Sequence, residues 1–242
     1  MLVNLGSGVL LSVMGAIAAL LADRFRRRRR LGHLYALAGK ARRIQIVVPS
    51  LNVSEFTPQG AQSVARVPTN IRVMPMAEGG AIAQLMSALH SIGKENIELV
   101  SQETYQNDAD FTISIGGPSL NSASAGILRD GFPRFSIKYP EHIASYGTTT
   151  FSPEITSDGE LREDYGFLAC SRPRPDRYCI VVCGVWAAGT QMAVSALLAA
   201  ERKSEITKRM IKRETFFAVV HGEVRGLVQE AVQTVEVRSV GA

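Results

Sequence analysis

The chain has 242 residues, of which 27 are Lys or Arg and 22 are Asp or Glu, so its formal net charge is +5. The positive charge is concentrated at the start, because residues 1–43 hold nine Lys/Arg and one Asp, while the rest holds 18 basic and 21 acidic residues. A weakly acidic domain is a poor match for long DNA or RNA, whose binding depends on many phosphate contacts. We therefore expect no long nucleic acid as a partner.

The first segment has the character of a membrane helix. Residues 2–22 contain no charged side chain, and a helix of that length spans roughly 30 Å. The arginines at 24 and 26–30 follow this segment instead of preceding it, which disfavours a cleavable signal peptide and keeps the following chain in the cytosol. Because they adjoin the membrane, these arginines fit anionic lipid headgroups better than a nucleic-acid patch.

These features predict a single-pass protein of the cell inner membrane. We expect a membrane helix over residues 1–23, a basic juxtamembrane linker over 24–43 and a cytosolic domain over 44–242. Small side chains let membrane helices approach closely. Those expected to make such contacts are Gly8, Ser12, Gly15, Ala16 and Ala19.

Apolar runs rich in Val and Ile alternate with helix-length stretches after residue 43, which is typical of an α/β fold. We predict a Rossmann-like, mostly parallel sheet with flanking helices, and the near-continuously apolar run 178–183 as its central strand. Residues 51–70 form a long polar connection, either a lid or an insertion. The expected strands are 43–48, 97–100, 111–115, 178–183, 216–220 and 234–240, with a strand meander over 135–170, and the expected helices are 79–91, 119–128, 190–202 and 205–212.

Two junctions between a strand and a helix are candidate ligand sites. The first, after residue 115, reads Gly-Gly-Pro before a helix whose free amides at 119–122 suit a phosphate or another anion. The same residues could simply end a strand. The candidate residues here are Gly116, Gly117, Ser119 and Asn121.

The second junction follows the strand 178–183, at the end of the strands where ligands bind in open α/β sheets. Trp186, the only tryptophan, could stack on a nucleobase or could cover an apolar edge. His221 follows a later strand and could reach the same rim or act as a hydrogen-bonding cap. The remaining candidates are Gly184, Gly189 and Thr190.

Motifs for catalysis or metal binding are missing from the sequence. It contains no Walker-type lysine motif, no G-x-S-x-G elbow and no zinc spacing. Glu163 and Asp164 adjoin on an expected strand edge, where solvated carboxylates are the simplest interpretation. Cys170, Cys179 and Cys183 are expected to be buried reduced thiols. We therefore assign no catalytic residue, metal or cofactor.

The segment from Ala188 to Met192, followed by an Ala-rich helix, resembles the Gly-Thr-Lys-x-Met turn of CRISPR-associated Rossmann-fold (CARF-like) sensors, which bind cyclic oligoadenylates. Gln191 stands where those sensors usually have lysine. Some members of that group carry one N-terminal membrane helix and act as membrane effectors in antiphage defence. The resemblance implies a homo-oligomer, a dimer or a tetramer, with a cyclic oligonucleotide across its symmetry axis. It implies ligand contacts from Pro49, Ser50, Gly189, Thr190 and Gln191.

Three functions fit these observations. The first is a signalling effector, in which a small anionic ligand, a cyclic oligonucleotide, binds the cytosolic domain and drives oligomerisation or pore formation by the membrane helix. The second is a membrane-anchored enzyme acting on a nucleotide or nucleotide sugar, which needs an acid, a base or a nucleophile facing the pocket. The third is a scaffold that docks proteins through an exposed apolar patch.

The orientation can be tested with a reporter fused after Ala242. We expect the fusion to behave as cytosolic, because the arginine run opposes translocation of its flank, and neutral replacements at Arg26 to Arg30 should weaken this bias. A fusion that is active on the far side of the membrane would contradict the assignment.

Overall fold

The computed structural model describes residues 31–52, 72–73, 76–199, 204–225 and 228–239. Among these, no helix is long and apolar enough to cross a membrane. The expected membrane helix, residues 1–23, lies outside this part of the chain, together with its contact residues Gly8, Ser12, Gly15, Ala16 and Ala19. Most of the polar connection 51–70 lies outside it too, and the short strands β2 (Leu51–Asn52) and β3 (Arg72–Val73) pair at its two ends.

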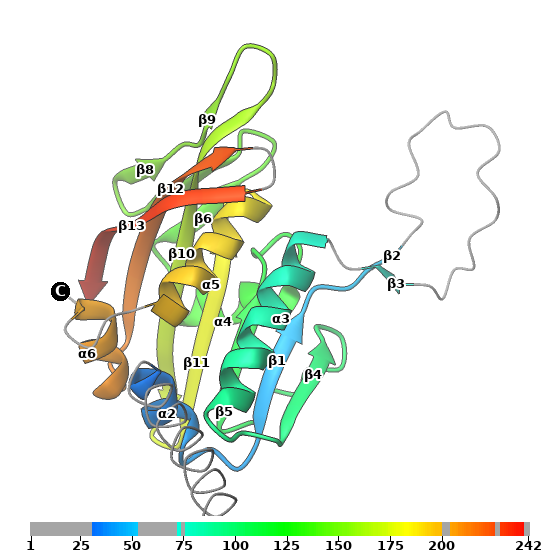
Figure 1. Ribbon diagram of the computed structural model, residues 1–242, viewed down its shortest axis with the longest axis vertical. Coiled ribbons are helices and arrows are strands. Elements are labelled where there is room, and N and C mark those ends of the chain that lie inside the picture. The colour runs from blue at the N-terminus through cyan, green and yellow to red at the C-terminus, as the bar shows by residue number, and fades with distance from the viewer. Residues whose placement is uncertain (1–30, 53–71, 74–75, 200–203, 226–227, 240–242) are drawn as a thin grey trace, which may run out of the picture.

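One large sheet forms the centre of the domain (Figure 1). Its strands are β1 (Ile44–Val48), β4 (Ile97–Ser101), β5 (Phe111–Ile115), β9 (Glu154–Ile155), β10 (Leu161–Arg174), β11 (Arg177–Gly184), β12 (Phe216–Arg225) and β13 (Val228–Ser239). They follow the order β13-β12-β10-β11-β5-β1-β4, and β9 pairs with β10. The fully buried β11 therefore lies in the middle of the sheet, as its apolar sequence predicts.

One half of this sheet is parallel and the other half is antiparallel. Strands β4, β1, β5 and β11 are parallel to one another, which confirms a parallel α/β core. Strands β10, β12 and β13 extend it in antiparallel fashion, so the sheet is mixed. Only two residues separate β10 from β11 and β12 from β13, and a parallel pair needs a crossover of a dozen or more. Apolar runs predict strands but do not give their direction.

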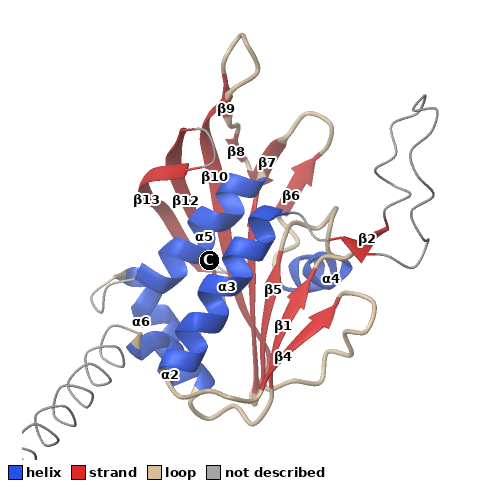
Figure 2. Cartoon of the chain, turned by 45° about the vertical axis from the view of Figure 1, so that its right-hand side comes forward, coloured by secondary structure: helices blue, strands red, loops and turns tan. Residues whose placement is uncertain are grey.

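Helices cover both faces of the sheet (Figure 2). On one face lie α2 (Gly32–Ala38), α3 (Met76–Ser91), α5 (Ala187–Ala199) and α6 (Glu205–Ile211). On the other face lie α4 (Ser122–Gly131) and a small antiparallel sheet of β6 (Phe135–Lys138), β7 (Ile143–Tyr146) and β8 (Thr149–Phe151). This small sheet occupies the region expected to be a meander.

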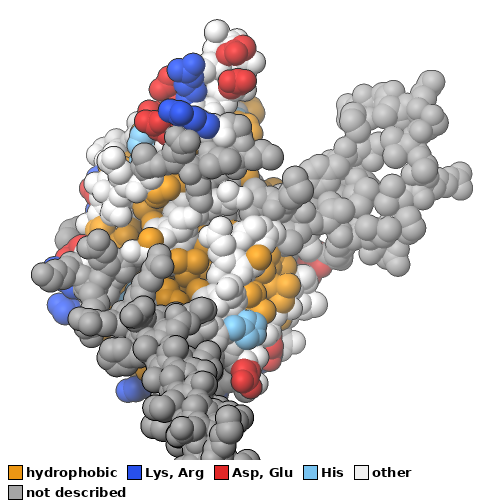
Figure 3. Space-filling view, viewed as in Figure 1, with side chains coloured by type: hydrophobic (Ala, Val, Ile, Leu, Met, Phe, Trp, Pro, Cys, Tyr) orange, Lys and Arg blue, Asp and Glu red, His pale blue; other side chains and the backbone are white. Residues whose placement is uncertain are grey.

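Alternation along the strands divides the interior into two cores. In β10, Leu168 and Cys170 face the α3 and α5 layer, whereas Phe167 and Ala169 face α4 and the small sheet. The second core is aromatic, because Phe167 packs with Phe135, Phe151 and Phe217. The outer side of the α3 and α5 layer also carries hydrophobic side chains (Figure 3).

Helix α2 lies within the segment expected to be linker. Its Leu34 and Leu37 are buried in the core shared with α5 and α6. The buried imidazole of His33 donates from Nε2 to the carbonyl oxygen of Leu197 at 2.6 Å, because a carbonyl can only accept. Burial lowers the pKa of His33, which keeps the ring neutral. The folded domain therefore begins before residue 44, a boundary that the surrounding arginines obscure in the sequence.

Three helices start away from their expected first residues, and the first of them, α3, begins at Met76 instead of residue 79. Helix α4 begins at Ser122 because Asn121 is its N-cap, with Oδ1 accepting from the amides of Ala123 and Ser124. Helix α5 begins at Ala187, three residues early, and a carboxylate from a neighbouring strand binds its first amides.

We expect α2 to stabilise the domain. Leu34→Ala in a fragment of residues 31–242 should lower the free energy of unfolding by about 2–5 kcal/mol, because the Leu34 side chain is fully buried. Lys40→Ala, at an exposed position after the helix, should change it by no more than about 0.5 kcal/mol. Equal effects in urea unfolding would contradict the packing of α2.

Candidate functional site

The glycine turns of both candidate junctions meet at the carboxyl ends of β1, β5 and β11. Pro49 follows β1, and its Cγ lies 3.5 Å from where a Cβ on Gly116 would stand. Gly116 has φ of +91°, in the region that favours glycine. A Cβ on Gly117 would come within 3.5 Å of the Tyr139 hydroxyl and 3.9 Å of the Gly184 carbonyl oxygen. The structure thus brings these four candidates to one edge, which we call the carboxyl edge.

Asp164 is the central polar group of this edge. The carboxylate comes from β10 and is 0% exposed. It accepts hydrogen bonds from the amides of Gly189 at 2.5 Å, Trp186 at 3.2 Å and Tyr165 at 2.8 Å. Burial raises the pKa of Asp164 to about 6, although its hydrogen bonds oppose the shift. The Asp164 carboxylate therefore occupies the start of α5, where a bound anion could otherwise lie.

Three glycines allow α5 to start so close to the sheet. A Cβ on Gly189 would lie 2.1 Å from the Tyr165 carbonyl oxygen, and one on Gly166 would lie 2.2 Å from the Gly189 carbonyl oxygen. A Cβ on Gly184 would lie 2.3 Å from the Trp186 carbonyl oxygen. Gly184 and Gly189 thus serve close packing here, and the neighbouring Thr190 is buried.

The backbone amides at the start of α4 are also hydrogen-bonded by side chains of the protein. Asn121 caps two amides, and its Nδ2 donates to the carbonyl oxygens of Ile115 at 2.8 Å and Val47 at 3.4 Å. Gln102 accepts from the amide of Ser122 at 2.6 Å. Asn121 therefore ties β1, β5 and α4 together, and the amides of residues 122–124 already have acceptors.

An aromatic group stands at the carboxyl edge, beside Gly117. The rings of His142 and Trp186 stack with centroids 3.9 Å apart, and Tyr139 meets His142 edge-on at 5.4 Å. Tyr139 also hydrogen-bonds Ser119, and burial raises the pKa of its phenol. Trp186 is 36% exposed and Tyr139 is 41% exposed, so both rings remain accessible. We call Tyr139, His142 and Trp186 the aromatic group.

His142 has an unusual environment within this group. Its φ is +52°, in the left-handed region, which directs the ring between Tyr139 and Trp186. Its buried Nδ1 has no hydrogen-bond partner within the described part of the chain. The sequence did not single out Tyr139 or His142, because only the loop between β6 and β7 places them beside the glycine turns.

Three other candidates lie to the sides of the edge. The Ser50 hydroxyl donates to Glu103 at 3.0 Å, on the β4 side. The Gln191 amide nitrogen lies 3.5 Å from where a Cβ on Gly80 would stand, on the α3 side. His221 pairs with Glu163 at 2.9 Å and packs against Tyr165, on the sheet face opposite α5.

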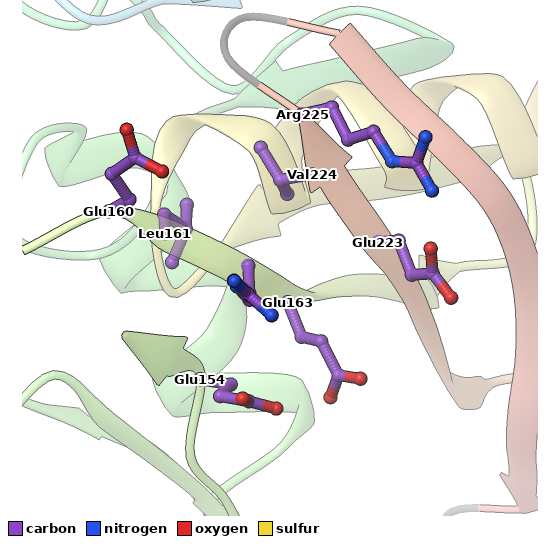
Figure 4. Close-up of a pocket in the computed structure, with 8 residues that line it drawn as sticks. Glu154, Glu160, Leu161, Glu163, Glu223, Val224 and Arg225 are labelled. Carbon is purple, nitrogen blue, oxygen red and sulfur yellow. The ribbon is translucent and has the colours of Figure 1, made fainter. Parts of the chain in front are cut away.

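Glu163 also lines an open hollow of 720 Å³ between β9, β10 and β12 (Figure 4). Four glutamates surround it, together with Arg162 and Arg225. Among the described residues, no group of three or more His, Cys, Asp or Glu side chains is placed to hold a metal ion. The three cysteines are free and buried, as expected, and burial raises the pKa of Cys183 to about 12, so its thiol stays protonated.

Comparison with models of protein families, with curated proteins and with solved structures finds no match to this chain. The resemblance to CRISPR-associated sensors therefore stays a prediction.

The raised pKa of Asp164 predicts a pH dependence of stability. The folded domain takes up a proton near pH 6, whereas the unfolded chain does so near pH 3.9, so stability should rise as the pH falls through this window. Relative to Asp164→Asn, wild type should gain about 1 kcal/mol of unfolding free energy between pH 7 and pH 5. Urea unfolding at pH 7 and pH 5 measures this difference. An equal change in unfolding free energy in wild type and in Asp164→Asn would contradict the prediction.

Proposed function

We propose that the domain is the sensing part of a membrane effector and that it binds a small anionic ligand of the cyclic-oligonucleotide class at the carboxyl edge. The observation that carries this proposal is the exposed aromatic group beside the glycine turns. A nucleobase that stacks on an aromatic side chain gains about 1–3 kcal/mol, and the indole of Trp186 is accessible for such a contact.

The hydrogen bonds of the edge limit the ways in which a ligand could be held there. Asp164, Asn121 and Gln102 already bind amides at the starts of α5 and α4, so those amides do not serve as the phosphate site. Recognition would depend on stacking of a base against the exposed part of Trp186. This mode differs from the helix-terminus phosphate site that the sequence suggested.

Helix α5 supplies a route from the ligand to the membrane. Its first turn is fixed at the carboxyl edge by Asp164, and near its other end the Leu197 carbonyl accepts from His33 in α2 (Figure 1). The 13 residues of α5 span roughly 20 Å. Helix α2 lies close in sequence to the expected membrane helix. A shift of α5 on ligand binding would therefore reach the membrane segment directly.

The alternative of an anchored nucleotide enzyme gains no support from Asp164. This carboxylate has a perturbed pKa, which is common in active sites. It is nevertheless fully buried and holds three backbone amides, so it faces no substrate. Its role is structural.

Binding can be tested by calorimetry on the full chain in detergent, with cyclic oligoadenylates as probes. Trp186→Ala should weaken binding by roughly 5- to 150-fold, the equivalent of one stacked base. Tyr35→Ala, an exposed aromatic residue on α2, should leave the affinity unchanged. No heat of binding in wild type, or equal affinity after Trp186→Ala, would contradict the proposal.

A further inference from the structure

A cavity of 670 Å³ lies along α4, away from the aromatic group. Its walls are α4 on one side and the loop between β4 and β5 on the other, and its floor is formed by β10 and β11. Binding sites for small molecules typically have volumes of about 300–1,000 Å³. None of Tyr139, His142 and Trp186 lines it, so the cavity is distinct from the proposed ligand contacts.

Part of the α4 wall carries only small side chains or none. Ser122, Ala123 and Gly126 all line the cavity. A Cβ added to Gly126 would meet no atom within 4 Å, so the helix backbone itself is accessible there. A flat ring can therefore lie directly against this wall.

The opposite wall holds an aromatic ring in place. The Tyr105 hydroxyl donates to Oδ1 of Asn107 at 2.7 Å, and the same oxygen accepts from Arg177 at 3.0 Å. Burial raises the pKa of Tyr105 to about 12, so the phenol stays neutral. The cavity thus has a fixed neutral ring on the wall opposite α4, whose side chains at Ser122 and Ala123 are small and at Gly126 absent.

The floor is neutral and the mouth is basic. The buried Cys179 lines the floor, and burial raises the pKa of its thiol to about 11. Arg129 and Arg172 are exposed at the mouth. Arg129 pairs with Asp130 at 3.1 Å, whereas Arg172 donates to the neutral carbonyl of Pro175 at 2.7 Å and keeps its full charge. The mouth therefore carries a net positive charge.

We propose that this cavity is a second binding site, for a ligand of the nucleoside monophosphate class. The base would lie between Tyr105 and the α4 wall at Gly126, and the phosphate would bind Arg172. A neutral floor suits the uncharged base, and a basic mouth suits the phosphate. This inference does not rest on the proposed function, because the two sites share no aromatic residue.

Calorimetry of the full chain with AMP and with adenosine tests the inference. Wild type should bind AMP, and Arg172→Gln should weaken AMP about tenfold while leaving adenosine unchanged, because only AMP carries the phosphate. Arg162→Gln, an exposed arginine at the other hollow, is the matched control and should have no effect.

A second variant fills the cavity. Gly126→Leu should abolish binding of both AMP and adenosine without lowering the unfolding temperature, because its Cβ has free space and leucine favours helix more than glycine does. Trp186→Ala should leave AMP affinity unchanged, which separates this site from the carboxyl edge. The inference is overturned if AMP does not bind at millimolar concentration, if Arg172→Gln weakens AMP and adenosine equally, or if Trp186→Ala abolishes AMP binding.

Discussion

The contact between the Asp164 carboxylate and the first amides of α5 determines how the carboxyl edge is built. It joins β10, from the antiparallel half of the sheet, to the turn that follows the central strand β11. Such a close approach is possible because Gly166 and Gly189 carry no side chains. Without this carboxylate, buried amides at the helix start would lack acceptors, at a cost of about 1–3 kcal/mol each. The position of Trp186 depends on the same contact, because its amide is one of the donors.

Because side chains already bind the amides at the helix starts, the carboxyl edge lacks the phosphate site that the sequence suggested. A helix start that follows a parallel strand commonly binds phosphate through free amides. Here the side chains of Asp164 and Asn121 accept hydrogen bonds from the amides at the starts of α5 and α4. The aromatic group remains exposed beside them. Under the proposed function, such an edge would select a ligand by its bases. The same helix, α5, runs from this edge to α2, so one element links the turn that holds Trp186 to the helix that follows the expected membrane segment.

Much of the parallel core could be predicted from the sequence, since long apolar runs such as 178–183 specify buried strands. The turns containing Gly116, Gly117, Gly184 and Gly189 were also found, because glycine pairs at strand ends mark close approaches. Asp164 was predicted to be solvated, since nothing local distinguishes it from Glu163. Its burial arises because β10 pairs with β12 and the turn after β11 brings backbone amides onto the carboxylate, which periodicity does not encode. The placement of His142 likewise depends on the small sheet.

The central claim is that ligand binding at the carboxyl edge acts on the membrane segment through α5 and α2. It is tested most directly by dye release from vesicles that contain the full chain, with a cyclic oligoadenylate added from the side of the folded domain. A ligand shifts an equilibrium only if it binds the two states with different affinities. We expect tight vesicles without ligand, release with ligand, and reduced release at unchanged ligand affinity in His33→Ala, which removes the bond between α2 and α5. Vesicles that stay tight at saturating ligand would contradict it.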